Sequence, residues 1–149
     1  MKIRLAEPRD YEQWLPLWRG YQTFYRVDLG DEVTQRTWAR FHDAAEPMHC
    51  AVAEDEKNGG RLVGLVHYIF HRSCWLLNDS CYLQDLFAAP DVRGTGVGRA
   101  LIEHVYAKAA AAGSARVWWL THESNHTAMQ LYDRIADKSG FVQYRKAIG

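Results

Sequence analysis

The sequence predicts an α/β fold in which helices cover both faces of one mixed sheet. Its first half carries a hairpin pattern, because two apolar runs flank the turn sequence EKNGG at residues 56–60. Its second half alternates apolar strands with helix-patterned segments, which is the order expected for parallel strands joined by crossover helices. The predicted order of elements is therefore β-α-α-β-β-β-α-β-α-β.

The first elements follow from apolar spacing. Residues 2–7 form a short predicted strand, and residues 8–26 form a helix with Asp10 as its N-cap. Pro16 should kink that helix or mark its true start. A second helix over residues 31–43 begins with acidic side chains that suit the positive end of its dipole.

The hairpin strands are predicted over residues 48–55 and 61–73. A mostly apolar strand over residues 80–90 is expected at the centre of the sheet. A glycine-rich turn then leads into a helix over residues 98–112, which Gly113 should end. The last predicted elements are a strand over 115–123, a helix over 125–140 and a strand over 141–147. No linker interrupts this series, so residues 1–149 are expected to form one domain.

Composition and charge exclude several classes of protein. The chain has 149 residues, of which 48% are hydrophobic, so a packed core is expected. Its net charge is zero, which removes the long-range attraction that binders of nucleic acid or anionic membranes use. Three scattered cysteines without a C-x-x-C motif suggest reduced thiols and a cytoplasmic location. We find neither a secretory signal nor a stretch apolar enough to span a bilayer.

The sequence RGTGVGR, at residues 93–99, predicts an anion site, because three alternating glycines lie between two arginines directly before a helix. The start of a helix leaves N–H groups unpaired, and its dipole favours negative charge. Glycines let the backbone approach a phosphate closely, and Arg93 and Arg99 can add charge-assisted bonds. We therefore expect a phosphate or pyrophosphate in this turn.

Two nucleotide motifs do not fit this turn. The dinucleotide fingerprint G-x-G-x-x-G/A would need a small residue where Arg99 or Leu101 stands. The P-loop needs Gly-Lys followed by Ser or Thr, whereas this chain has Arg99 and Ala100 after Gly98. Both interpretations are excluded by the residues.

Residues 93–98 match R/Q-x-x-G-x-G/A, the acetyl-coenzyme A signature of the GNAT superfamily of N-acetyltransferases. YLQDLFAAPDVRGTGVGRALIEHV resembles motif A of that superfamily, and ESNHTAMQLYDRIADKSGFVQYRK resembles its motif B. The predicted order of elements is also similar, so the resemblance covers nearly the whole chain. The segments WLTHExN and HYIFHR look closest to the branch that acts on small amines and D-amino acids and includes a yeast histone and polyamine acetylator.

The resemblance implies acetyl-coenzyme A as the donor and names its binding positions. The central strands would splay at a bulge before Pro90, where the backbone of Leu86, Phe87 and Ala88 would pair with the pantetheine arm. A splayed sheet leaves polar backbone groups to be satisfied, and the amide-rich pantetheine resembles a peptide strand. The remaining implied cofactor positions are Arg93, Gly94, Thr95, Gly96, Val97, Gly98, Arg99, Asn125 and Tyr132.

The resemblance also implies catalytic roles. Tyr132 aligns with the general acid that protonates the leaving thiolate, and tyrosine titrates at about pH 10, so it carries the proton at neutral pH. By position alone, Tyr132 could equally be a core aromatic. The general base stays open. Related polyamine acetylators carry a glutamate where Gln84 stands, and Asp85 should face the other side of the strand. Asp85, Glu123 or a chain of water molecules could serve, and water is favoured.

The acceptor pocket is expected near the first two helices and the sheet centre, with Tyr21, Tyr25, Trp75, Trp119 and Glu123 as candidates. No metal is expected. His67 and His71 lie four apart on a predicted strand, about 13 Å, too far to share an ion, and His122 and His126 have no third ligand.

The expected function is therefore acetyl-coenzyme A-dependent transfer to a primary amine of a small molecule, such as an amino acid or polyamine. The alternatives are a protein-lysine or histone-tail acetyltransferase and a non-catalytic coenzyme A sensor. A homodimer or higher homo-oligomer is expected by analogy, without nucleic-acid or membrane partners. The acceptor, the general base, the oligomeric state and the pathway stay open.

Overall fold

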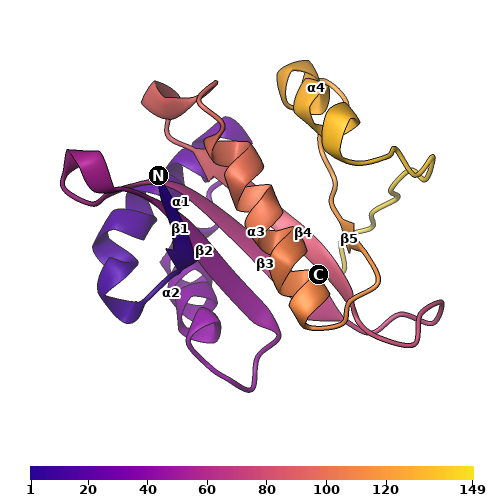
Figure 1. Cartoon of the computed structure of the whole chain (residues 1–149). Helices are drawn as coiled ribbons and strands as arrows, with labels where there is room; N and C mark the ends of the chain where they lie inside the picture. The colour runs from indigo at the N-terminus through magenta and orange to yellow at the C-terminus, as the bar shows by residue number, and fades with distance from the viewer. The chain divides into compact units, whose positions relative to one another are not determined.

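A five-stranded sheet with the strand order β1-β2-β3-β4-β5 organises residues Met1–Trp119 in the computed structural model, which describes residues 1–149. The strands are β1 (Lys2–Leu5), β2 (Met48–Asp55), β3 (Arg61–His71), β4 (Ser80–Ala88) and β5 (Val117–Trp118). The helices are α1 (Tyr11–Phe24), α2 (Gly30–Phe41), α3 (Val97–Ala111) and α4 (His126–Ile135) (Figure 1). By its internal contacts the chain divides into two compact units, Met1–Trp119 and Leu120–Gly149. The single domain expected from the sequence stays a prediction.

The sheet is mixed, as the sequence predicts. Strands β1 to β4 pair antiparallel, and β4 pairs with β5 in parallel. The hairpin that joins β2 to β3 turns through Gly59 and Gly60, whose positive φ angles are 71° and 76°. These left-handed conformations carry little strain in glycine, which explains why the turn sequence ends in two of them.

Helices lie on both faces of the sheet. Consecutive residues of β3 show this, because the His67 ring contacts Trp14 and Trp18 of α1 whereas the Tyr68 ring contacts His104 of α3. Figure 1 shows α3 running along β3 and β4, with α1 and α2 beyond the other face. The core fills both interfaces, and its fully buried side chains include Trp14, Val52, Leu65, Val66, Leu101 and Ile102.

Strand β4 contains a bulge at Gln84. His67 pairs with Asp85 and Tyr68 pairs with Leu83, so Gln84 is an extra residue on β4 without a partner on β3. On its other side, β4 pairs with β5 only through Cys81 and Tyr82. From Leu83 onward, no strand of the larger unit pairs with that edge of β4. The splayed edge that the resemblance implied is therefore present.

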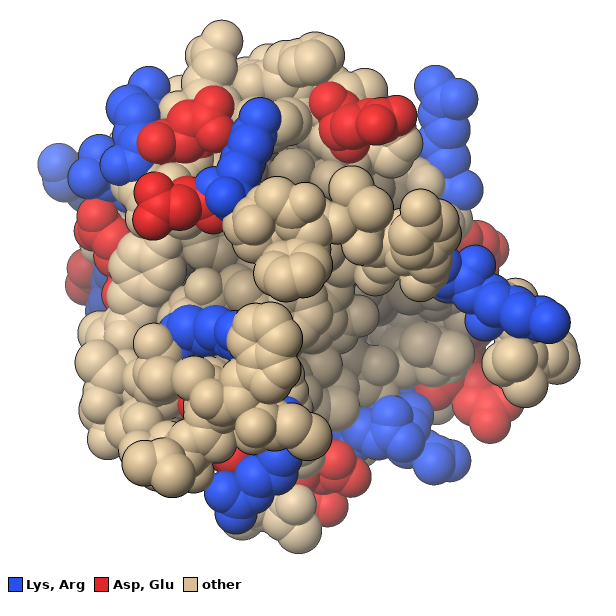
Figure 2. Space-filling model, turned by 90° about the vertical axis from the view of Figure 1, so that its right-hand side faces the viewer, with Lys and Arg blue, Asp and Glu red and all other residues tan.

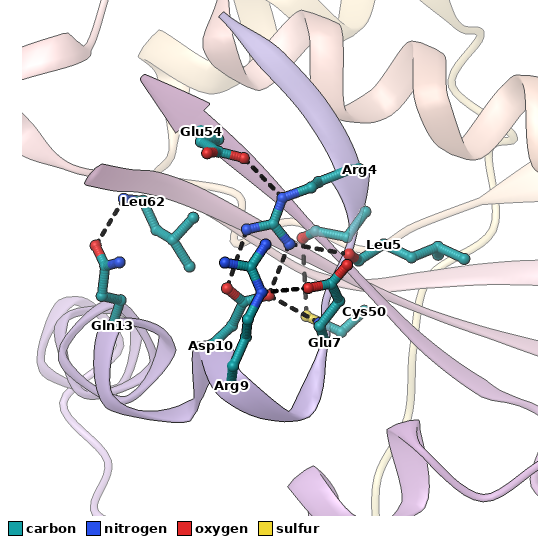
Figure 3. A network of polar contacts seen from close by, with 10 residues as sticks. Arg4, Leu5, Glu7, Arg9, Asp10, Gln13, Cys50, Glu54 and Leu62 are labelled. Atoms are coloured by element: carbon teal, nitrogen blue, oxygen red, sulfur yellow. Dashed lines mark hydrogen bonds and ion pairs between the residues drawn. The ribbon is translucent and has the colours of Figure 1, made fainter. Parts of the chain in front are cut away.

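A polar network fastens the start of α1 to the sheet (Figure 3). The Arg4 guanidinium donates to both carboxylate oxygens of Asp10, at 2.7 and 3.0 Å, and to Glu54 at 2.7 Å. The backbone N–H of Glu7 also donates to Asp10, at 2.8 Å. Asp10 is 4% exposed and precedes α1 as predicted, but its side chain makes no capping bond to that helix.

Several helix and strand boundaries differ from the predicted ones, and three of these differences affect a predicted feature. Helix α1 begins at Tyr11, so Pro16 lies inside it and does not mark its start. The strand predicted over residues 115–123 is limited to Val117–Trp118, because only these residues pair with β4. The helix predicted over residues 125–140 ends at Ile135, and Gly140 lies beyond it.

The strand predicted over residues 141–147 is not formed. A strand needs a partner for its backbone groups, and the unit Leu120–Gly149 contains no other strand. Its apolar side chains Phe141, Val142 and Tyr144 are 77% to 94% exposed. No helix anywhere in the chain reaches the length and apolar character that crossing a membrane requires.

Candidate active site

The glycine-rich turn at residues 93–98 has the backbone geometry of an anion site. Gly94 and Gly96 have φ angles of +79° and +90°, and Gly96 is the N-cap of α3. A Cβ atom on either glycine would meet nothing within 4 Å, so the backbone conformation and not packing requires glycine. The first N–H groups of α3 point out of the helix start without intrahelical partners. Unpaired N–H donors at a helix start can bind a phosphate group, so the turn is a candidate anion site.

The arginines beside this turn are held by neighbouring groups. The Arg93 guanidinium lies 5.2 Å from the centre of the Phe87 ring and 5.9 Å from that of Phe24, and its Nε donates to the Ala88 carbonyl at 3.1 Å. Arg99 donates to Glu103 one helical turn further along α3, at 2.9 Å. Arg93 therefore remains at the end of β4, whereas Arg99 is directed along the exposed side of α3.

Two contacts set the position of the turn relative to the sheet. Asp91 accepts two bonds from the Arg61 guanidinium at the start of β3, at 2.8 and 2.9 Å. A Cβ atom at Gly64 would lie 3.0 Å from Val97 and 3.2 Å from the Phe87 carbonyl oxygen. Gly64, on β3, therefore lets the first turn of α3 approach β3 closely.

An open apolar groove of about 440 Å³ runs between α1 and the end of β4. Gly20 shapes it, because a Cβ atom there would lie 2.8 Å from the Phe87 ring. Phe87 and Arg93, two of the predicted cofactor positions, are therefore at the wall of a groove and not in a closed core. The lining residues include Leu17, Gly20, Thr23, Phe24, Phe87, Pro90 and Arg93.

Asp85 lies on the α1 face of the sheet and is 8% exposed. Its Oδ2 atom is 2.9 Å from Nδ1 of His67, and Nε2 of His67 is 3.0 Å from the indole nitrogen of Trp14. All three side chains are buried. Gln84, by contrast, is exposed, so the two neighbouring residues do not share an environment.

Two predicted substrate residues, Tyr21 and Tyr25, lie within the electrostatic range of Asp85. The Tyr21 ring stacks on Trp18 at 5.2 Å and contacts Tyr25 at 4.9 Å. Burial and, after it, the negative charge of Asp85 raise the pKa of Tyr21 well above its ordinary value. The same two causes raise the pKa of Tyr25. The structure thus brings one carboxylate and two phenols together.

A second aromatic cluster continues along this face. Trp118 stacks on Tyr82 at 4.2 Å, and its indole nitrogen donates to Nε2 of His71 at 2.9 Å. Tyr82 also contributes to the electrostatic environment of Tyr21. His67 and His71 are thus engaged by different tryptophans, and the chain contains no group of three His, Cys, Asp or Glu side chains placed to hold a metal.

The other predicted residues lie elsewhere. Trp119 contacts Tyr106 of α3 at 6.3 Å, and Trp75 is 76% exposed in the loop between β3 and β4. Glu123, Asn125 and Tyr132 belong to the unit Leu120–Gly149. Within it, Glu123 is exposed, Tyr132 is half-buried on α4, and the Asn125 amide donates to Thr121 at 3.2 Å.

Sequence reasoning missed the part that His67 and Trp14 play around Asp85. The sequence analysis considered His67 within the segment HYIFHR and excluded it as a metal ligand, and it assigned no role to Trp14. The available signal was a histidine within an otherwise apolar strand, because a buried imidazole needs hydrogen-bond partners.

Comparison with known proteins agrees with this geometry. Residues 11–136 match the model of the acetyltransferase (GNAT) family. The chain is 37% identical over 144 residues to the D-amino-acid N-acetyltransferase HPA3 of Saccharomyces cerevisiae, covering 97% of this chain and 89% of that protein. It is 29% identical over 155 residues to the thialysine N-epsilon-acetyltransferase of Mus musculus, covering 97% and 91% of the two chains.

Solved structures show the same fold. A probable acetyltransferase superposes with a TM-score of 0.86 at 21% identity, covering 100% of this chain and 99% of that one. A ribosomal-protein-alanine N-acetyltransferase from Brucella melitensis biovar Abortus 2308 superposes with a TM-score of 0.80 at 20% identity, covering 99% and 98%. The mixed sheet, the turn before α3 and the family match lead to one conclusion: this chain belongs to the GNAT family and is an N-acetyltransferase.

Proposed function

We propose that this enzyme uses acetyl-coenzyme A to acetylate the primary amine of a small molecule. The observation that carries the proposal is the sequence of features along β4: a carboxylate, a splayed edge and then a left-handed glycine turn that opens α3. Along β4, the carboxylate would bind the amine, the splayed edge would bind the pantetheine arm, and the glycine turn would bind the pyrophosphate.

The donor would bind along this path. The pyrophosphate would accept bonds from the backbone at Gly96, Val97 and Gly98, with Thr95, Gly94 and the charge of Arg93 and Arg99 close by. The pantetheine arm would pair with the backbone of Leu86, Phe87 and Ala88, where β5 leaves the edge of β4 unpaired. Asn125 is proposed as a further contact of the arm, and we also propose that residues 1–149 act as one domain.

The acceptor would enter as an ammonium ion beside Asp85, next to the rings of Tyr21 and Tyr25. One carboxylate and aromatic faces suit a single positive charge. Trp119 and Glu123 are proposed as further contacts. The relatives named for D-amino acids and thialysine, both small amines, favour this class of acceptor.

The proposed reaction is a direct displacement. The ammonium first loses a proton, and its lone pair then attacks the thioester carbonyl carbon to form the new C–N bond. As the tetrahedral intermediate collapses, the C–S bond breaks, the electron pair leaves with sulfur, and the Tyr132 hydroxyl protonates the thiolate.

The first proton is the harder one to move. Carboxylic acids titrate at about pH 4 and alkyl ammonium ions at about pH 10, so a carboxylate alone is a weak base for this task. We therefore propose that Asp85 binds and orients the ammonium while water carries the proton to solvent. Glu123 is the alternative base.

The decisive experiment offers acetyl-coenzyme A with D- and L-amino acids, thialysine, polyamines and a lysine-containing histone-tail peptide. Thiol release and the mass of the acetylated product are both measured. Saturable release with a small amine is expected. Tight acetyl-coenzyme A binding without product from any amine would make the chain a coenzyme sensor. Preference for the peptide would favour protein acetylation, although basic and acidic side chains are interspersed, without an acidic groove, on the face in Figure 2.

The acid role is tested by Tyr132→Phe. We expect kcat to fall about a hundredfold, within the range of general acid catalysis, while the Kd of acetyl-coenzyme A is unchanged. Tyr144→Phe, at a 94% exposed tyrosine, is the matched control. Equal losses of turnover and coenzyme affinity in Tyr132→Phe would contradict the role.

We also propose where the enzyme is located and how it assembles. Cys50, Cys74 and Cys81 are all free thiols, which fits a reducing compartment such as the cytoplasm. We also propose a homodimer, which multi-angle light scattering of the purified enzyme tests directly.

A further inference from the structure

A buried hydrogen-bonded chain runs from α1 through β3 to β4. It begins at the Trp14 indole, continues through both nitrogens of His67 and ends at Asp85 Oδ2, with distances of 3.0 and 2.9 Å. Trp14 is 0% exposed and His67 is 2% exposed. Pairing of His67 with Asp85 across the two strands depends on the bulge at Gln84, because that extra residue sets the local register.

The hydrogen bond from Trp14 determines the tautomer of the His67 ring. An indole nitrogen can only donate, so Nε2 of His67 must accept the bond from Trp14. A neutral imidazole that accepts at Nε2 carries its hydrogen on Nδ1. Nδ1 therefore donates to the Asp85 carboxylate, and the His67 ring is the neutral Nδ1–H tautomer.

The residues packed around His67 hold its ring in this orientation. Trp18 and Phe41 pack on the imidazole, with ring centres 5.0 and 4.6 Å away. The titratable groups that face this chain are Asp85 on β4, Cys50 opposite His67 on β2, and Tyr21 on α1. Burial raises the pKa of both Cys50 and Tyr21, so neither supplies a charge at neutral pH. From α2, Phe41 offers only an apolar ring.

We propose that Trp14 and His67 are positioning residues for acetyl transfer: by holding the imidazole in its neutral Nδ1–H form, they keep Asp85 oriented and free to pair with the acceptor ammonium. The inference rests on the proposed function of Asp85. If a second proton entered at Nε2, the imidazolium would itself satisfy Asp85 and compete with the substrate. Trp14 prevents this, because its N–H occupies the lone pair that the proton would need.

Removing the Trp14 donor should therefore create an acid-sensitive enzyme. In Trp14→Phe, Nε2 of His67 is free to take a proton, and imidazoles do so at about pH 6.5 in water. Deprotonation of the ammonium makes kcat/KM depend on pH in every variant, so the measured quantity is the ratio of kcat/KM for the amine between Trp14→Phe and wild type at each pH. We expect this ratio to show an acid limb, falling about tenfold per pH unit once the imidazolium predominates. The loss should appear in the KM of the amine, whereas the KM of acetyl-coenzyme A stays constant.

Two further variants separate this effect from damage to the core. Trp18→Phe removes another buried indole donor from α1, one that bonds to Thr34, and should show no acid limb. His67→Gln keeps a donor for Asp85 but cannot titrate, so Trp14→Phe with His67→Gln should lose the limb. An acid limb that persists in the double variant, or none in a folded Trp14→Phe enzyme, would overturn the proposal.

A direct measurement covers the case in which Trp14→Phe does not fold. In wild-type enzyme with ¹⁵N-labelled histidine, the ring nitrogens of His67 should show the neutral Nδ1–H pattern from pH 8 down to pH 5.5. An Nε2–H pattern, or an imidazolium at pH 5.5, would refute the assignment. These results are distinct from failure of the proposed function, which would appear as absence of turnover in wild type.

Discussion

Replacing Asp10 with asparagine should lower the free energy of unfolding by about 3 kcal/mol at pH 7, the lower end for breaking a buried ion pair. The new amide side chain would keep one acceptor oxygen but lose the charge that both Arg4 bonds depend on. The substitution changes almost no volume, so the loss reports the network at the start of α1 and not a cavity.

The structure sets this magnitude. The two Arg4–Asp10 bonds measure 2.7 and 3.0 Å, and the side chains are 14% and 4% exposed, so solvent screens them little. Arg4 would not be left without a counterion, because Glu54 still lies 2.7 Å away. That remaining partner is why the lower end of the range applies.

The pKa of Asp10 determines how the stability difference between wild type and Asp10→Asn changes with pH. The Arg4 bonds hold the pKa of Asp10 below its ordinary value, against the opposing effect of burial. The stabilisation is therefore complete above the unfolded pKa of about 3.9 and is lost as the pH falls through the lower folded value. The gap between wild type and Asp10→Asn should stay constant from pH 7 to pH 5 and narrow below about pH 4.

Urea unfolding followed by tryptophan fluorescence measures both quantities. Asp133→Asn, at an exposed aspartate of α4, is the control and should stay within about 0.5 kcal/mol of wild type. The reasoning fails if Asp10→Asn costs less than about 1 kcal/mol, or if its gap to wild type widens on acidification.

Three further predictions test other parts of the fold. Gly96→Ala places an alanine in a left-handed conformation, which costs about 1–2 kcal/mol. If the turn changes conformation to avoid this cost, calorimetry should show roughly tenfold weaker binding of acetyl-coenzyme A. Unchanged affinity would contradict a role of the left-handed turn in binding. Gly64→Ala forces a Cβ to within 3.2 Å of a backbone carbonyl and should cost about 1–3 kcal/mol in thermal melts, an effect that an unchanged Tm would rule out. Ellman's reagent should find one fast thiol, the exposed Cys74, because burial raises the pKa of Cys50 and raises that of Cys81 to about 11; three equally fast thiols would show that the core opens readily.

Local pattern predicted the hairpin well and the chain end poorly. The β2 strand is Met48–Asp55 in both the prediction and the structure, because its apolar run is bounded by turn residues that act locally. Residues 141–147 have an equally apolar pattern but form no strand, since strand formation depends on a partner that the pattern cannot specify. Asp10 occupies the expected position, but its side chain bonds to Arg4 and does not cap the helix. The periodicity of apolar residues cannot predict such a side-chain contact.

In the candidate site, too, local sequence pattern predicted some features, whereas others depend on pairing between strands. The left-handed conformations of Gly94 and Gly96 follow from the spacing of glycines before a helix, so the turn was predictable. The resemblance implied a bulge in the strand before Pro90, but its position at Gln84 was not predictable, because glutamine carries no signal for one. That bulge decides which residue of β3 stands opposite Asp85, and hence that His67 and not a neighbour contacts it.

The two buried aspartates of the larger unit, Asp10 and Asp85, are 4% and 8% exposed and differ in what surrounds them. Arg4 neutralises Asp10 with two charge-assisted bonds, which satisfies the carboxylate within the fold. Asp85 is held instead by the His67 imidazole, which is neutral in the proposed tautomer. A neutral donor orients a carboxylate without cancelling its charge, and a buried charge without a counterion is costly to maintain. A cation that arrives and leaves with each turnover would supply the missing partner, and the proposed role of Asp85 in binding the acceptor ammonium assigns the substrate to that place.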